Sequence, residues 1–219
     1  MDVPENITEA KKVQCALKKK VRIKPLDKMP SFVAGVDAAF FQNTIIAVAC
    51  LYTFPELAIS EDAHSIEKVH FPYVPGYLSF REGPAIIHAV HKLSRKPDLI
   101  LFDGQGIAHP QGLGIASHIG VLLNMPTIGC AKSRLIGTYK TPGYSKGDYS
   151  SLLHKGKIIG TVLRTRDKVK PVFISPGHLI DVKSSMDILI KCTTRYRLPE
   201  PIRRADRLSG ELKHQYKLR

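Results

Sequence analysis

The sequence contains no tryptophan, only four cysteines and no long uninterrupted apolar segment. No apolar run approaches the roughly 20 residues that a helix needs to cross a bilayer. The first residues, Met-Asp-Val-Pro-Glu, lack the basic start and apolar centre of a secretory signal. We therefore expect no association with a membrane.

The cysteines are too scattered to form a recognisable framework. Cys15, Cys50, Cys130 and Cys192 include no Cys-x-x-Cys pair and mostly stand in apolar surroundings. Neither a set of disulfides nor a structural zinc site is predicted from this spacing. A reducing, cytoplasmic setting is the simplest expectation.

Acidic residues are scarce relative to basic ones. Nineteen Asp and Glu stand against 33 Lys and Arg, which gives a net charge of +14. The excess is concentrated at residues 18–24 and 195–207. Such a surplus favours a nucleic-acid partner, because neutralising phosphates releases condensed counterions. A solvated basic surface, or adaptation to salt or heat, is the alternative, and charge does not distinguish cutting a partner from holding it.

The length and composition predict one globular domain over residues 1–219. Hydrophobic residues make up 43% of the chain, and no internal repeat, low-complexity tract or linker interrupts it. We expect a monomer.

The hydrophobic periodicity predicts alternating strands and helices. An opening helix is expected over 6–20, with Asn6 as its cap and Glu9 three residues later. Apolar, β-branched runs predict a hairpin that turns at 42–43, followed by a half-exposed strand between 57 and 70. The predicted strands are 32–37, 44–53, 98–102, 127–130, 160–164 and 171–175, and the further helices are 81–94, 115–124, 183–196 and 199–217.

This order, three strands followed by helix–strand crossovers, predicts an α/β fold with a mixed β-sheet flanked by α-helices. It is also the connectivity of ribonuclease H-like nucleases, although many α/β proteins share parts of it.

Two aspartates follow predicted strands. Asp37 ends the first strand, and Asp103 ends the strand after the first crossover. If these strands are neighbours, both carboxylates project from one edge of the sheet. An isolated buried carboxylate is costly, so it needs hydrogen bonds, exposure or a cation. The alternative is that each aspartate caps a turn.

Two further acids stand on predicted helices. Glu82 lies at the start of its helix, where an acid complements the helix dipole. Asp206 lies on the last helix, where a surface ion pair with Arg203 or Arg207 is the alternative interpretation. Four such carboxylates can converge on a pair of hard cations, and oxygen ligands suit Mg²⁺ or Mn²⁺. Two ions about 3.5–4 Å apart can clamp a phosphodiester for in-line displacement.

Four segments together resemble a known family. They are Val-Ala-Gly-Val-Asp-Ala-Ala-Phe at 33–40, Pro-Tyr-Val-Pro-Gly-Tyr-Leu-Ser-Phe-Arg-Glu-Gly-Pro at 72–84, a glycine-rich segment at 101–118 that begins Leu-Phe-Asp-Gly-Gln-Gly, and Ser-Pro-Gly-His at 175–178. The chain resembles endonuclease V, the repair nuclease for deoxyinosine, from about residue 25 to Asp206. The resemblance implies a ribonuclease H-like fold.

The resemblance also implies a set of metal ligands. Asp37, Glu82 and Asp103 match the metal-binding carboxylates, and Asp206 matches a position where the family uses Asp or His. The implied cofactor is Mg²⁺, for which Mn²⁺ can substitute.

His109 and Lys132 match polar positions near the active site of the family. Lys132 is expected to orient the nucleophilic water or bind phosphate, with a basic loop residue as the alternative. His109 is expected to contact the scissile region or a metal-bound water, with a structural role as the alternative. His178 lies in a good turn sequence and is left out of the catalytic set.

The segment Pro72-Tyr73-Val-Pro75 predicts a stiff loop that presents an aromatic ring at low entropic cost. The resemblance implies that this loop is a wedge that enters the duplex and helps to extrude the damaged base. The alternative is a rigid turn with Tyr73 packed on its own domain.

A pocket for the extruded base is implied as well. Gly76, Leu78, Gly104 and Ile115 match positions that line it in the family, and glycine permits close approach of the backbone.

The implied activity is a nick at the second phosphodiester 3′ to deoxyinosine, leaving 3′-hydroxyl and 5′-phosphate ends. Two alternatives remain at this point: an inosine-specific ribonuclease acting on single-stranded RNA, and a basic nucleic-acid-binding protein without catalysis.

Overall fold

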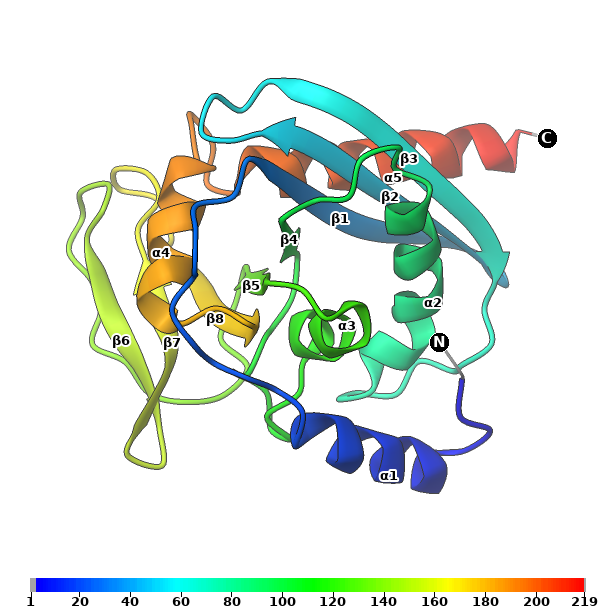
Figure 1. Cartoon of the computed structure of the whole chain (residues 1–219), viewed down its shortest axis with the longest axis horizontal. Coiled ribbons are helices and arrows are strands. Elements are labelled where there is room, and N and C mark those ends of the chain that lie inside the picture. The colour runs from blue at the N-terminus through cyan, green and yellow to red at the C-terminus, as the bar shows by residue number, and fades with distance from the viewer. Residues whose placement is uncertain (1–2, 219) are drawn as a thin grey trace.

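The computed structural model describes residues 3–218 of the chain. Within that range a mixed β-sheet carries helices on both faces (Figure 1). The strands are β1 (Phe32–Phe41), β2 (Thr44–Thr53), β3 (Ile59–Lys68), β4 (Leu99–Phe102), β5 (Thr127–Ala131), β6 (Tyr149–His154), β7 (Lys157–Leu163) and β8 (Val172–His178). The helices are α1 (Ile7–Lys18), α2 (Leu78–His91), α3 (Ile115–Leu123), α4 (Val182–Lys191) and α5 (Glu200–Lys217).

All of these strands form one sheet in the order β3-β2-β1-β4-β5-β8-β7-β6. β1, β2 and β3 form the expected antiparallel meander, whereas β4 is parallel to both β1 and β5. β8, β7 and β6 add an antiparallel extension beyond β5. The prediction of a mixed sheet flanked by helices is confirmed.

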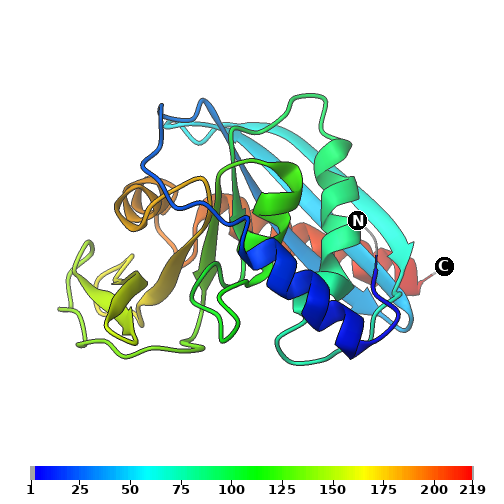
Figure 2. The same cartoon turned by 60° about the horizontal axis from the view of Figure 1, so that its bottom comes forward.

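Side chains alternate between two cores along the central strands, as strand geometry requires. Ala34 and Val36 belong to the core beneath α2 and α3, whereas Val33 packs with Ile202 of α5 on the opposite face. α1 lies outside α3, and α4 covers β7 and β8 (Figure 2). Because Asp37 shares the odd-numbered face with Val33, its side chain faces α5.

A glycine lets α5 pack closely against β1. A Cβ atom at Gly35 would overlap the backbone carbonyl of Pro201, in the first turn of α5. This close contact brings the next turns of α5, with Asp206 and Ser209, to the part of β1 that carries Asp37.

The predicted position of Asp37 at a strand end is wrong. β1 continues to Phe41, and Asp37 pairs with Val48 of β2 because the hairpin extends the ladder. On its other side, the register of β1 with β4 ends at Val36 and Phe102. Asp37 therefore lies just beyond the last parallel pair, beside the point where Asp103 leaves β4.

Several other elements differ from the predictions. α2 begins at Leu78, so Glu82 lies in its second turn rather than at its start. β8 continues to His178 and pairs with β5, so Ser-Pro-Gly-His is a strand and not a turn. α4 ends at Lys191, because the chain turns there to begin α5. β6 was missed, since its polar, mostly exposed sequence lacks an apolar run.

The opening helix and the cysteines agree with expectation. Asn6 caps α1, with its side-chain oxygen 2.9 Å from the backbone nitrogen of Glu9. All four cysteines are free, and three of them are buried. Among residues 3–218, no helix has both the length and the apolar character needed to cross a membrane.

Candidate active site

Four carboxylates from separate elements meet at the edge of the sheet where β4 ends. Asp37 comes from β1, Glu82 from α2, Asp103 from the loop after β4 and Asp206 from α5. The pKa of Asp37 is raised to about 6, mainly by burial and also by the nearby charges of Asp103 and Asp206, while the hydrogen bond from Ser209 opposes the rise. The fold thus brings these four carboxylates near one another, and their role as metal ligands stays a prediction.

Glu82 is the carboxylate that carries the largest electrostatic cost. Burial raises its pKa to about 8, and the charges of Asp37 and Asp103 add to the rise, while Arg81 opposes it. Mutual repulsion among buried acids is the pattern expected where a cation is to be held.

Lys132, directly after β5, lies beside these acids. Its Nζ atom lies 2.6 Å from Oδ2 of Asp103, whose side chain is only 16% exposed. Burial opposes the charge of Lys132, but the bond to Asp103 and the charges of Asp206 and Asp37 outweigh burial and raise its pKa. The single positive charge therefore offsets only part of the negative charge of the cluster.

The donor set suits a hard cation, since carboxylate oxygens are the ligands that Mg²⁺ and Mn²⁺ prefer. Within residues 3–218, however, no three His, Cys, Asp or Glu side chains lie close enough to enclose an ion as they stand. The ion pair with Lys132 accounts for one oxygen of Asp103. These side chains would have to move closer together to bind an ion.

Asp206 does not form the surface ion pairs that were its alternative interpretation. Arg203 pairs with Glu200, and Arg207 pairs with Glu211. Asp206 is exposed and contributes its charge to the cluster.

Ser209 belongs to the site and was missed in the sequence. Its buried hydroxyl lies 2.9 Å from Oδ2 of Asp37 and donates to it. The signal was available in the spacing, because Ser209 follows Asp206 by three residues and shares its helical face.

A pocket of about 230 Å³ lies beside the carboxylates. Gly104, next to Asp103, forms part of its wall. The four positions expected to line a base pocket, Gly76, Leu78, Gly104 and Ile115, all line this one. The full lining consists of Tyr73, Val74, Pro75, Gly76, Leu78, Ser79, Gly104, Gln105, His109, Leu113, Gly114, Ile115 and Leu135. Pro72 is exposed and lies one residue outside this lining.

Two glycines shape the wall of the pocket. Gly76 has φ +86°, a conformation that strains other residues. A Cβ atom at Gly104 would lie 2.7 Å from Cγ2 of Ile115, so a side chain there would close the space. Gln14 of α1 donates to the carbonyl of Gly76 over 3.0 Å and supports this loop from outside.

Tyr73 stands out from the surface at the mouth of the pocket. Its side chain is 69% exposed, so the alternative in which it packs on its own domain is not what the structure contains. The adjacent Tyr77, by contrast, is buried with Phe71 and Phe80 against α1. The loop is therefore anchored at Tyr77 and free at Tyr73.

The two histidines considered from the sequence lie in different places. His109 is buried in the wall of the pocket, its ring close to Gly76, and burial lowers its pKa. His178 pairs with Thr127 at the start of β5, the edge of the sheet opposite the carboxylates. Its Nδ1 atom accepts from the backbone of Arg22.

Gln105 is a second residue that sequence reasoning missed. It lines the pocket, and its Nε2 donates to the carbonyl of Ser133 over 3.2 Å. Its Oε1 atom is buried without a hydrogen-bond partner among the described residues. A buried acceptor without a partner calls for an explanation, and only the place of Gln105 in the fold reveals it.

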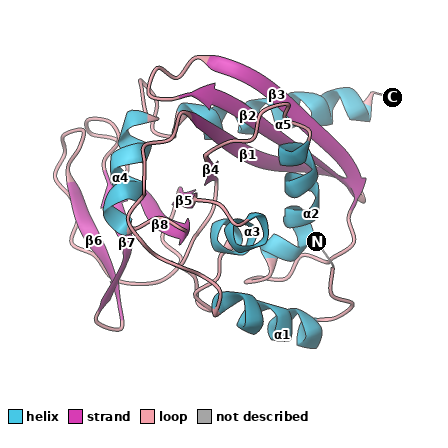
Figure 3. Cartoon of the chain, in the orientation of Figure 1, coloured by secondary structure: helices cyan, strands magenta, loops and turns pink. Residues whose placement is uncertain are grey.

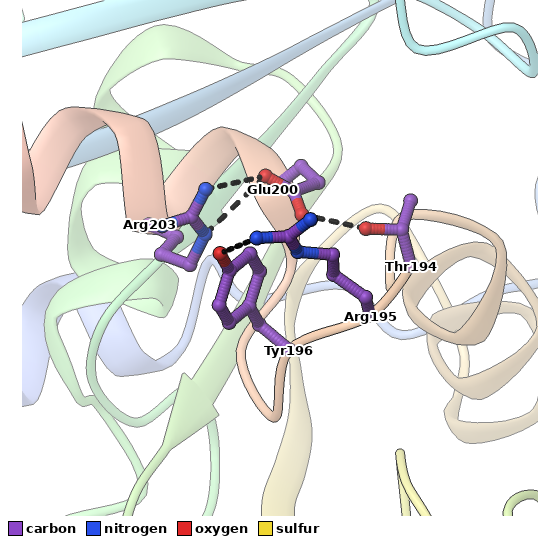
Figure 4. Close-up of polar contacts among 5 residues, drawn as sticks. All are labelled: Thr194, Arg195, Tyr196, Glu200 and Arg203. Atoms are coloured by element: carbon purple, nitrogen blue, oxygen red, sulfur yellow. Dashed lines mark hydrogen bonds and ion pairs between the residues drawn. The ribbon is translucent and has the colours of Figure 1, made fainter.

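The segment between α4 and α5 contacts the backbone of Lys132 through Arg197. Tyr196 lies under the guanidinium groups of Arg195 and Arg203, and Glu200 accepts from Arg203 and Thr194 (Figure 4). These contacts hold the loop that contains Arg197, the residue after Tyr196. The Nη2 atom of Arg197 lies 2.6 Å from the backbone carbonyl of Lys132.

The family model for endonuclease V matches residues 15–207. This chain belongs to the endonuclease V family. Endonuclease V of Dictyoglomus turgidum is 48% identical over 197 residues, which cover 90% of this chain and 86% of that protein.

Solved endonuclease V structures share the fold. The crystal structure from Streptomyces avermitilis has a TM-score of 0.94 and 37% identity, and the match covers 98% of this chain and 96% of that one. The Ciona intestinalis endonuclease V, in complex with a 24mer DNA containing an inosine followed by a ribo-adenosine, has a TM-score of 0.83 and 25% identity over 97% and 100% of the two chains. The sheet described above is thus the ribonuclease H-like fold of endonuclease V, as expected.

Proposed function

We propose that this protein is a DNA-repair endonuclease that recognises deoxyinosine and hydrolyses the second phosphodiester bond on its 3′ side. The proposal rests on the position of the carboxylate cluster directly beside the pocket. Asp103 belongs to the cluster, and Gly104, the next residue, lines the pocket. A base held in the pocket would keep its own strand beside the acids. The inosine-containing DNA bound by the Ciona relative supports this substrate class.

Asp37, Glu82, Asp103 and Asp206 would hold Mg²⁺ or Mn²⁺. The raised pKa values of Asp37 and Glu82, and the all-oxygen donor set of the four residues, support a divalent ion. Such an ion would neutralise charge on the phosphodiester and activate water for in-line attack. Breaking the bond to the 3′ oxygen then leaves a 3′-hydroxyl on one product and a 5′-phosphate on the other.

The protein itself contributes position and charge. Lys132 holds Asp103 in place and adds a positive charge where the phosphate lies. Ser209 fixes one oxygen of Asp37. Tyr73 is positioned to enter the base stack as the lesion leaves it, because its ring is exposed beside the pocket.

The pocket offers groups that would distinguish hypoxanthine from adenine. Hypoxanthine has a protonated N1 and a carbonyl at C6, whereas adenine has an unprotonated N1. Gln105 lines the pocket, and if its side chain turned towards the base, its unpartnered Oε1 atom would accept a hydrogen bond from N1–H. Against adenine the same acceptor would face a lone pair, which costs affinity.

The test is a single labelled duplex that contains one deoxyinosine, incubated with and without Mg²⁺ and mapped to nucleotide resolution. The proposal predicts one Mg²⁺-dependent cut at the second bond 3′ to the lesion, and none in the matched adenosine duplex. Asp103→Asn should abolish the cut, whereas Asp27→Asn, an exposed change at the opposite sheet edge, should not. Binding without any cut would mean a protein that only holds nucleic acid.

The same sequence prepared as an RNA strand separates DNA from RNA activity, because tolerance of the 2′-hydroxyl decides the substrate. Faster cutting of the inosine RNA than of the inosine DNA would overturn the assignment to DNA.

A further inference from the structure

A second hollow lies on the far side of Lys132 from the base pocket. It is an open groove of about 750 Å³. Its walls carry positive charge and no Asp or Glu, and it is flanked by aromatic rings; the residues that matter are Lys132, Arg134, Tyr139, Lys170, Phe173 and Arg197. We refer to it as the cationic groove.

The cationic groove is continuous with the carboxylate cluster. Lys132 lines the groove and is also the residue whose Nζ pairs with Asp103. The segment that follows Lys132 separates the two hollows, since Arg134 lines the groove and Leu135 lines the base pocket. The carboxylates therefore lie between a pocket on one side and a basic channel on the other.

Two arginines, Arg164 and Arg197, hold the walls of the groove together. Arg164 is 5% exposed and donates to the carbonyls of Pro142, Gly143 and Val169, so it ties the segment after Thr141 to the segment before Lys170. Arg197 bridges the carbonyls of Lys132 and Pro171, 2.6 and 2.8 Å away. The groove is thus formed before any ligand arrives, which lowers the entropic cost of binding.

Lys132 pairs with Asp103, but the other cations that line the groove have no carboxylate partner within residues 3–218. Arg134 lies over the ring of Tyr139, 5.7 Å from its centroid, and Tyr139 meets Phe173 edge to face. Lys170 is exposed on the opposite bank. A groove that combines cations with aromatic rings is typical of proteins that bind along a nucleic-acid strand.

We propose that the cationic groove binds the part of the cut strand that lies 3′ to the scissile phosphodiester. This inference rests on the proposed function, which places the lesion in the base pocket and the cut on its 3′ side. If the strand runs from the base pocket past the carboxylates, the part that extends beyond Lys132 is the part on the 3′ side of the cut. Arg134 and Lys170 contact the phosphates of that portion.

The test shortens the 3′ side of the inosine strand while keeping the 5′ side and a full-length complement unchanged. Strands with about two and about ten nucleotides beyond the cut differ in whether they fill a groove of this kind. The kcat/KM ratio of the long to the short strand is measured for the unaltered protein, for the double variant Arg134→Ala with Lys170→Ala, and for a control. Arg197 is left intact because it also holds Lys132.

The control is Lys28→Ala with Lys96→Ala, which removes the same charge from exposed positions beside Asp98, at the opposite edge of the sheet. Each of the three proteins is assayed at the same number of degrees below its own melting temperature. Binding of the long strand in chelator, over a series of salt concentrations, gives a second measurement that does not depend on cutting.

The unaltered protein and the control are expected to prefer the long strand by about tenfold, and the groove variant to lose that preference. The slope of log affinity against log salt should also fall by about 1 to 2 in the groove variant, as expected for two lost phosphate contacts. Equal rates on both lengths in the unaltered protein would overturn the groove assignment alone. No cut at any length would overturn the proposed function itself, and competition by polyglutamate as strong as by DNA would assign the groove to acidic peptides instead.

Discussion

The Nζ atom of Lys132 lies 2.6 Å from Oδ2 of Asp103, and the two residues follow neighbouring parallel strands, β5 and β4. The pair joins the carboxylate cluster to the basic side of the site. It also fixes one carboxylate oxygen of Asp103 in place.

Lys132→Met should reduce kcat by roughly 10²- to 10³-fold, the usual cost of removing one group that stabilises a developing charge. Binding of the inosine duplex should change far less, because many other cations contact the backbone. Single-turnover cutting and binding in chelator measure the two quantities. Lys157→Met, an exposed change on β7, is the matched control, and an unchanged kcat in Lys132→Met would remove Lys132 from the mechanism.

Ser209→Ala should make cutting more dependent on alkaline pH. The Ser209 hydroxyl stabilises the ionised form of Asp37, so its loss should raise the pKa of Asp37 further above its value of about 6. The rate should fall several-fold near neutral pH and recover as pH rises, which a purely structural defect would not do. Ser117→Ala removes another buried hydroxyl, one without a described hydrogen-bond partner, and should leave the profile in place.

Glu82→Gln should stabilise the metal-free protein at alkaline pH. The pKa of Glu82 is raised from 4.5 to about 8 in the folded state. Its favourable contribution is thus complete below pH 4.5 and is lost as pH rises towards 8, where the unfolded chain is ionised and the folded one retains its proton. In chelator near pH 8 the variant should melt several degrees above the unaltered protein.

Added Mg²⁺ should reverse that order by stabilising the unaltered protein more than Glu82→Gln. Glu211→Gln, at an exposed residue of α5, should follow the unaltered protein in both conditions. A lower melting temperature for Glu82→Gln in chelator would contradict the assignment of Glu82 to a repelling cluster.

Tyr73→Ala should reduce the preference for an inosine duplex over an undamaged one by about tenfold, since stacking on an aromatic ring contributes roughly 1–3 kcal/mol per base. Binding titrations on both duplexes measure it. Tyr149→Ala removes another exposed ring and should preserve the preference. An equal loss on both duplexes would make Tyr73 a general contact instead of a wedge.

Much of this arrangement could be predicted from the sequence. Apolar runs and helical periodicity placed the central strands, and the motifs singled out Asp37, Glu82 and Asp103 before any coordinates. The expectation failed where local pattern is weak. The predicted strand ended at Asp37 because this charged residue interrupts the apolar run, although the hairpin ladder continues to Phe41. Strand β6 was not predicted because an exposed edge strand needs no apolar run.

The residues that were missed act through tertiary contacts. Ser209 matters because α5 packs on Gly35, and Arg197 matters because its guanidinium reaches the carbonyl of Lys132, 65 residues away in sequence. Gln105 stands out only once its Oε1 atom is seen to be buried without a partner. No spacing rule in the sequence reports such contacts.

The position of a bound ion tests the account most directly. Crystals soaked in Mn²⁺ should give an anomalous difference peak about 2.0–2.4 Å from carboxylate oxygens of Asp37 and Asp103, with Glu82 close by. The same soak of Asp37→Asn crystals should lose that peak. A peak at some other place on the molecule, with Asp37 and Asp103 free of metal, would contradict it.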